Sequence, residues 1–70
     1  MSDKEFLKRM GEHIRRVRKE KNISLKTLGA LCDIDHTSIS RIENGHFNSY
    51  VLTLKRITDV LEIEVKELFS

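Results

Sequence analysis

Apolar residues recur at spacings of three and four along most of this chain, which is the periodicity of helices with one buried face. In residues 3–21 the stripe consists of Phe6, Met10, Ile14 and Val17. No stretch alternates apolar and polar residues convincingly enough to indicate a strand, and the chain contains no proline. We therefore expect an all-α fold.

Signals for helix starts and ends divide the chain into five segments. Ser2 or Asp3 can cap the first helix, Asn22 can end it in a left-handed conformation, and Ser24 can cap the second. Gly45 follows the third helix as a terminating residue. The expected helices cover about residues 3–21, 24–32, 35–44, 50–61 and 64–69.

The chain length limits the fold to one domain, residues 1–70. A chain of this size buries only about 60% of the surface that it exposes when unfolded, so association with a partner would help its small core. A single cysteine cannot form a disulfide within the chain, and no secretory segment opens it, which favours the cytoplasm. No apolar run approaches the roughly 20 residues of a membrane span, so no membrane partner is expected.

Positive charge is concentrated in the first third of the chain. Residues 1–26 contain nine Lys and Arg against four Asp and Glu, whereas residues 27–70 contain four against seven. Such a segment can attract a polyanion. It can equally be a solvated helix with ion pairs four residues apart, such as Lys8 with Glu12. Charge alone leaves both interpretations open.

The second and third helices are joined by a short turn around residues 33–34, and such a turn forces a steep crossing, as in a helix-turn-helix. Gly29 lies within the second helix, where glycine costs up to about 1 kcal/mol relative to alanine. Its presence suggests that another backbone passes close by. The expected core of this unit is Leu28, Leu31, Cys32, Ile34, Ile39 and Ile42.

The opposite face of the third helix is small, polar and capable of hydrogen bonding. A purely structural surface helix would carry Glu and Lys there, because Ser, Thr and His are poor helix formers. We infer that this face is kept for contacts. It contains His36, Thr37, Ser40, Arg41 and Asn44.

The stretch from Leu25 to Gly45 resembles the helix-turn-helix of the lambdoid-phage-repressor-like, or Xre-type, transcription regulators. The most specific part is Ile-Ser-Arg-Ile-Glu-Asn-Gly at residues 39–45, and Ile-Arg-Arg-Val-Arg at residues 14–18 is similar to the family's first helix. Residues 54–57 and 60–63 match the later helices. The resemblance covers nearly the whole chain and implies a compact five-helix, lambda-repressor-like domain with its helix-turn-helix at helices two and three.

The resemblance also implies a function, which is sequence-specific binding of double-stranded DNA to regulate transcription, for example as a repressor. The third helix would enter the major groove, and a homodimer would bind a palindromic operator. Arg41 is the first candidate for direct readout, because arginine can bond guanine O6 and N7 together. The candidate base-reading residues are His36, Thr37, Ser40 and Arg41. The candidate phosphate-binding residues are Ser24, Lys26, Thr27, Asn44, His46, Asn48 and Tyr50.

A structural role follows from the same resemblance. A first-helix arginine of the family pairs with the glutamate after the recognition helix, which here means Arg18 with Glu43. The last segment and its approach suggest a further role, because the expected dimer interface is Ile63, Val65, Leu68 and Phe69. We expect these residues to be shared between the dimer and the monomer core, since Val65, Leu68 and Phe69 cannot all point the same way on one short helix.

Three positions depart from the family pattern. Asp33 stands where the inter-helix turn usually has glycine, and aspartate tolerates the left-handed conformation better than most residues. Leu25 replaces a glutamine that usually bonds a phosphate, and the loop after Gly45 lacks the usual proline. The family's usual phosphate contacts therefore do not carry over directly to Leu25 or to this loop.

Other functions have less support. The chain has no Cys-x-x-Cys, His-Glu-x-x-His or paired-acid motif, so we expect no enzyme, metal or cofactor, and no small-molecule ligand is evident. An antitoxin or a protein-interaction module of the same fold stays open as the alternative. RNA binding is less favoured, because an aromatic stacking platform is lacking.

Overall fold

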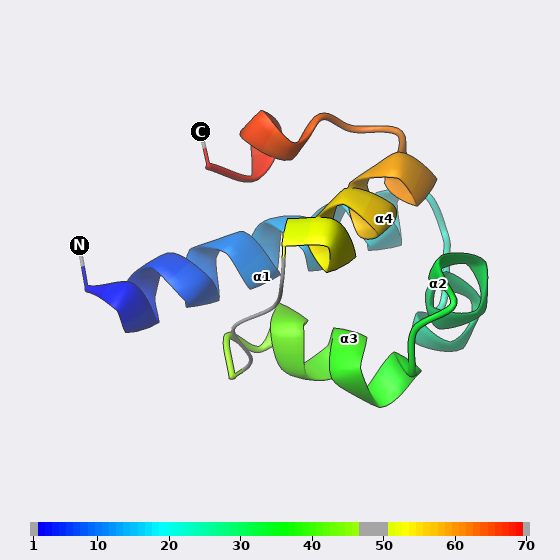
Figure 1. Ribbon diagram of the computed structural model, residues 1–70, viewed down its shortest axis with the longest axis horizontal. Coiled ribbons are helices and arrows are strands. Elements are labelled where there is room, and N and C mark those ends of the chain that lie inside the picture. The colour runs from blue at the N-terminus through cyan, green and yellow to red at the C-terminus, as the bar shows by residue number, and fades with distance from the viewer. Residues whose placement is uncertain (1, 47–50, 70) are drawn as a thin grey trace.

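The computed structural model describes residues 2–46 and 51–69, and this part of the chain is helical without strands (Figure 1). The all-α prediction is confirmed. The elements are α1 (Asp3–Glu20), α2 (Leu25–Cys32), α3 (His36–Glu43), α4 (Val51–Leu61) and the short 3-10 helix η1 (Val65–Phe69).

The prediction of five α-helices is wrong for the last segment. Four α-helices are present in the described residues, and the fifth segment is the 3-10 helix η1. It is only five residues long, and its first turn closes through a bond from Glu67 N–H to the Glu64 carbonyl three residues earlier. Short helical pieces commonly adopt this tighter 3-10 form.

The helix ends depend on side chains that the sequence had marked. The Ser2 hydroxyl accepts from Glu5 N–H at 3.1 Å and caps α1, and the Ser24 hydroxyl caps α2 in the same way. Asn22 and Asp33 have φ values of 58° and 57°, so both adopt the left-handed conformation expected of them. Glu62 also does so after α4, at φ 61°, where no residue type had signalled it.

The core lies between the four α-helices. Its fully buried members are Ile14, Leu28, Ile39, Ile42, Ile57 and Leu61. Ile34 is partly buried and packs against them.

Two residues of the expected apolar faces lie outside this core. Leu31 is 59% exposed and Phe6 is 43% exposed. Leu28 and Cys32, four residues apart on α2, are buried, whereas Leu31 lies beside them at the edge of the helix face. A helix of eight residues buries only the part of its surface that its neighbours reach, so Leu31 does not belong to the core.

The arrangement places α3 at one side of the molecule. α3 packs against α1 and α2, while η1 packs against α1 and α4. In Figure 1, α3 lies at the bottom, η1 lies at the top, and α1 and α4 lie between them. The outer face of α3 and the segment around η1 are therefore on opposite sides of the domain.

Candidate nucleic-acid interface

The turn between α2 and α3 is as tight as its sequence predicts. Ile34 N–H donates to the Gly29 carbonyl at 2.9 Å. A Cβ atom at Gly29 would lie 2.7 Å from the Ile34 carbonyl oxygen and 3.1 Å from His36 N. The close backbone approach that a mid-helix glycine had suggested is confirmed, and it brings the start of α3 directly against α2.

The N-terminal end of α3 begins at an aspartate cap. The Asp35 carboxylate accepts from Thr37 N–H at 3.0 Å, and its Oδ1 lies 3.8 Å from His36 Nδ1. Behind this cap, Ile39 and Ile42 are fully buried. The helix is therefore anchored by its apolar face, which leaves the other face outward.

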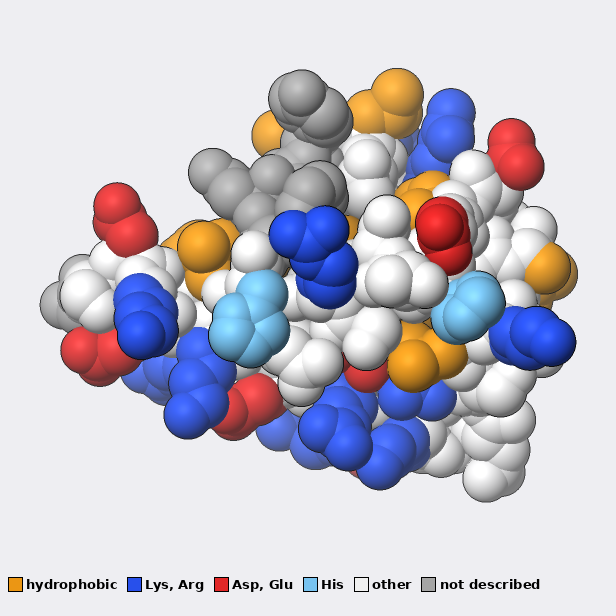
Figure 2. All heavy atoms as spheres, turned by 90° about the horizontal axis from the view of Figure 1, so that it is seen from below, with side chains coloured by type: hydrophobic (Ala, Val, Ile, Leu, Met, Phe, Trp, Pro, Cys, Tyr) orange, Lys and Arg blue, Asp and Glu red, His pale blue; other side chains and the backbone are white. Residues whose placement is uncertain are grey.

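The outward face of α3 carries the candidate base-reading residues. His36, Thr37 and Arg41 are exposed and Ser40 is half-buried, so one helix presents all four. Figure 2 views the molecule from the side on which α3 lies, and its middle is largely white, with histidine and basic side chains and a few acidic ones among and around the white atoms. Such a surface offers hydrogen-bond donors without a dense net charge.

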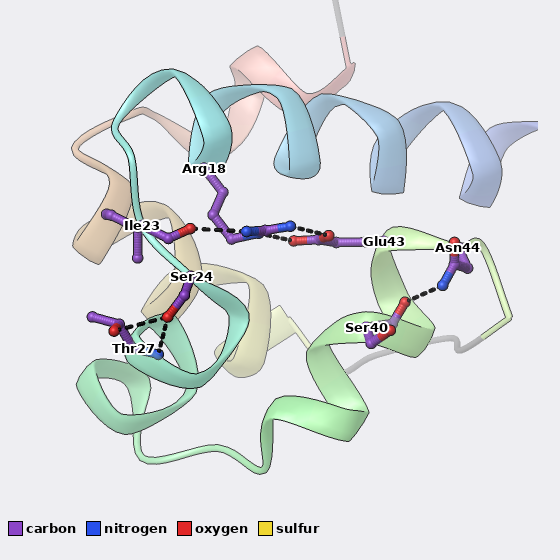
Figure 3. A network of polar contacts seen from close by, with 7 residues as sticks. All are labelled: Arg18, Ile23, Ser24, Thr27, Ser40, Glu43 and Asn44. Carbon is purple, nitrogen blue, oxygen red and sulfur yellow. Dashed lines mark hydrogen bonds and ion pairs between the residues drawn. The ribbon is translucent and has the colours of Figure 1, made fainter.

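The start of α2 holds three of the candidate phosphate-binding residues. Ser24, Lys26 and Thr27 are exposed there. The Ser24 hydroxyl accepts from Thr27 N–H at 3.1 Å and donates to the Thr27 hydroxyl oxygen at 2.9 Å (Figure 3). These two side chains form the first turn of α2 together, and the Lys26 ammonium supplies the positive charge beside them.

The remaining candidates follow α3. Asn44 is exposed, and its side-chain N–H₂ donates to the Ser40 carbonyl at 2.9 Å (Figure 3). His46 is exposed. Asn48 and Tyr50 lie outside the described residues.

A buried ion pair joins α1 to the end of α3. Arg18 Nε donates to Glu43 Oε2 at 2.7 Å, and Nη2 donates to Oε1 at 3.1 Å. The third guanidinium nitrogen donates to the Ile23 carbonyl at 2.8 Å (Figure 3). Arg18 is 7% exposed and Glu43 is 4% exposed. The pairing that the family resemblance implied is thus formed, through two hydrogen bonds and nearly shielded from solvent.

The candidate dimer residues have mixed environments. Leu68 is buried in the core, Ile63 and Val65 are half-buried, and Phe69 is 47% exposed. The ring of Phe69 stacks on that of Phe6, with centroids 5.3 Å apart and planes inclined by 7°. Leu68 therefore serves the monomer, and among the four candidates only Phe69, stacked on Phe6, is an exposed apolar side chain.

Cys32 lies among the buried residues, and its thiol donates to the Arg56 carbonyl at 3.7 Å. Burial raises the pKa of the Cys32 thiol above its ordinary value, an effect that the Arg56 charge partly offsets. The thiolate, which is the nucleophilic form, is disfavoured there. Among residues 2–46 and 51–69, no group of three or more His, Cys, Asp or Glu is placed to hold a metal ion. In the same part of the chain, the helices are too short or too polar to cross a membrane.

This geometry, two short helices crossing at a tight turn with a polar outward face on the second, matches a known family. A model of the helix-turn-helix family fits residues 14–68. The chain belongs to this family. The resemblance to Xre-type regulators that residues 14–18 and 25–45 had indicated is confirmed.

Two relatives are similar over most of this helix-turn-helix chain. The control protein C.MunI of a Mycoplasma species is 40% identical over 63 residues, which cover 89% of this chain and 85% of C.MunI. The HTH-type transcriptional regulator SlrR of Bacillus subtilis (strain 168) is 38% identical over 62 residues, which cover 87% of this chain and 41% of SlrR. SlrR therefore contains much sequence with no counterpart here.

Two solved structures share the fold. The restriction-modification controller protein C.AhdI from Aeromonas hydrophila has a TM-score of 0.87 at 30% identity, with 90% of this chain and 96% of C.AhdI covered. SinR, a master regulator for biofilm formation whose crystal structure contains DNA, has a TM-score of 0.81 at 31% identity, with 87% and 98% covered. The domain observed here is thus the lambda-repressor-like one that the sequence predicted.

One position near this interface was not singled out from the sequence. Gly11 is buried on α1, against the last turn of α3. The signal was present, because a glycine within a helical stretch is unfavourable unless another backbone approaches it. Gly29 on α2 is the corresponding case, since there too another backbone passes close by.

Proposed function

We propose that this chain is a sequence-specific, double-stranded DNA-binding regulator of transcription that acts in the cytoplasm as a homodimer. The observation that carries the proposal is the outward face of α3, which is polar along its length while the opposite face is fully buried. Membership of the helix-turn-helix family supports it. So does the likeness to SinR, which has been crystallised with DNA.

In this proposal α3 enters the major groove with its N-terminal end leading. Thr37 and Arg41 are four residues apart, so they lie one turn from each other on the same face. The Arg41 guanidinium donates to O6 and N7 of one guanine, and Thr37 contacts a neighbouring base edge or a thymine methyl group. His36 and Ser40 flank these contacts. Base specificity thus comes from α3.

Phosphate contacts hold the module in position. The first turn of α2, with Ser24, Lys26 and Thr27, meets one stretch of backbone. Asn44 and His46 at the other end of α3 meet another, together with Asn48 and Tyr50. The exposed basic residues of α1 add longer-range attraction. Affinity should therefore fall steeply as the salt concentration rises.

A homodimer accounts for specificity that one small module cannot supply. Two copies related by a two-fold axis would place their α3 helices about 34 Å apart, one turn of DNA, on a palindromic site. We place the dimer surface at Ile63, Val65, Leu68 and Phe69. Because Leu68 is buried in its own core, Phe69 supplies most of the contact, and the half-buried Ile63 and Val65 add to it.

The experiment that tests this function is selection of bound sites from random duplex DNA. The expected result is one enriched motif with two-fold symmetry, bound with a steep salt dependence. Sedimentation of the protein with and without the selected duplex gives the stoichiometry. Recovery of no motif, or an affinity that does not change with salt, would contradict DNA recognition. An asymmetric motif bound by a single copy would contradict the homodimer alone.

A further inference from the structure

α1 crosses the C-terminal end of α3 at Gly11, the position on α1 that carries no side chain. A Cβ atom on Gly11 would overlap the Ile42 carbonyl oxygen and lie 2.5 Å from that of Glu43. Both oxygens belong to the backbone of the last turn of α3, so neither can rotate away as the end of a side chain would. The separation between these two helices is therefore set by the absence of a side chain at Gly11.

A second contact lies just beyond the end of α3. Gly45 has φ +74°, and a Cβ atom there would lie 2.8 Å from the Cα atom of Lys8. Lys8 and Gly11 are three residues apart on α1, so one turn of α1 meets the last turn of α3 and the residue that ends it. Gly11 leaves room on the α1 side of this contact, and Gly45 leaves room on the α3 side.

A third contact joins the same two elements further along α1. Arg18 lies seven residues after Gly11, which places it on the same face of the helix two turns later. Its guanidinium holds the Glu43 carboxylate through two bonds, at 2.7 and 3.1 Å (Figure 3). The end of α3 is thus pressed against α1 at Gly11 and tied to it at Arg18.

α1 also holds the start of α2. Arg18 donates to the Ile23 carbonyl, immediately before Ser24, where the proposed phosphate contacts begin. The other end of α3 is attached to α2 through the tight turn at Gly29. α1 therefore fixes how far the C-terminal end of α3 stands from the rest of the helix-turn-helix, while the turn acts as the pivot.

We propose that Gly11 sets the angle at which α3 enters the major groove and so determines which bases are read, without touching DNA. This inference rests on the DNA-binding function proposed above. Ordinary contact begins at 3.4 Å, so a methyl group at Gly11 requires α1 and α3 to separate locally by about 1 Å. Hydrogen bonds to base edges weaken over such a displacement, because their usual range spans only about 0.5 Å.

The test compares Gly11→Ala with Ile57→Val, a truncation of a fully buried residue on α4. Each protein selects its own site from random duplex DNA. Its affinity is then measured for the wild-type site and for a random duplex of equal length, at a temperature where circular dichroism shows it to be folded. The ratio of the two affinities reports base recognition and cancels the fraction of folded protein.

For Gly11→Ala we expect an altered selected motif and at least a tenfold smaller affinity ratio on the wild-type site, with random-duplex affinity changed less than threefold. Ile57→Val should lower the melting temperature and keep both the motif and the ratio. Alanine is the better helix former, so α1 itself is not weakened by the substitution.

An unchanged motif with an unchanged ratio for Gly11→Ala would overturn the inference. If that variant does not fold, Arg18→Lys decides, because lysine keeps the charge but gives up the two-bond contact with Glu43. A smaller ratio for folded Arg18→Lys supports the control of α3 by α1, and an unchanged ratio overturns it. Failure of the wild-type protein to select any site is a separate result, which contradicts the proposed function itself.

Discussion

α1 and α3 each bury one face against the same core, yet their outer faces consist of opposite kinds of side chain. α1 is 18 residues long, and its exposed positions are largely Lys, Arg and Glu, which favour helices. α3 has eight residues, and its exposed and half-buried positions are mostly Ser, Thr and His, which do not favour helices. α1 can therefore serve as a stable frame, whereas α3 depends on its packing to remain helical.

Long-range attraction to DNA and discrimination between bases are thus assigned to different helices, which the net charge of the whole chain does not show. The positive charge is concentrated on α1, where it can attract a polyanion from a distance. The groups suited to distinguishing bases are on the outward face of α3, where Arg41 is the one fully charged residue, since Glu43 is buried against Arg18. Four substitutions test whether the two helices really divide the work in this way.

The largest effect is expected on stability, from breaking the Arg18–Glu43 ion pair that joins α1 to α3. Glu43→Ala leaves the Arg18 guanidinium buried without its carboxylate, which should lower the free energy of unfolding by about 3–5 kcal/mol. Urea denaturation followed by circular dichroism measures this loss. The double variant Arg18→Met, Glu43→Leu removes both charges and should lose much less. If the single variant lost less than the double variant, the buried pair would not hold α3 in place.

The next largest effect is expected on the recognition of DNA bases, from a substitution on α3 that leaves α1 unchanged. Arg41→Ala should weaken binding to the selected site by about 1–3 kcal/mol and relax the preference at one base pair, with little change on random duplex DNA. Arg56→Ala on α4 is the matched control, because it removes the same charge from another exposed helix position. Fluorescence anisotropy with both duplexes measures the two affinities. Equal losses on both duplexes would exclude base readout by Arg41.

Much of this architecture was predictable because local chemistry and tertiary contacts agree. Ser2 and Ser24 cap helices, Asp33 ends one in the left-handed conformation, and Gly29 marks a close approach, as their residue types indicate. Each of these features depends on a few neighbours in the chain. The helix-turn-helix and its outward face therefore followed from the sequence.

The errors arose where the outcome depends on distant parts of the chain. Leu31 is apolar and adjacent to the core face of α2, but only the packing of whole helices decides that it stays exposed. Glu62 ends α4 in a left-handed conformation that no glycine or asparagine announces. The form of η1 as a 3-10 helix and the contact of Gly11 with α3 likewise depend on tertiary geometry.

A smaller and uniform effect is expected where phosphate contacts are proposed. Lys26→Gln should weaken binding to the selected and the random duplex alike and reduce the slope of log affinity against log salt by about 0.9. Lys66→Gln on η1 is the control, because η1 lies on the side of the molecule away from α3. Titrations from low to high salt measure the slope. A change confined to the selected site would mean that Lys26 reads bases.

The smallest effect is expected from α1 itself. Arg15 is exposed, and a charge that acts only at long range is screened beyond about 8 Å at physiological salt. Arg15→Gln should therefore slow association slightly at low salt and leave affinity nearly unchanged at 0.15 M, as stopped-flow mixing with labelled duplex can measure. If Arg15→Gln instead cost as much as Arg41→Ala, α1 would lie within the interface. The proposed division, in which α1 only attracts DNA and α3 reads its bases, would then be wrong, because both helices would contact the same DNA.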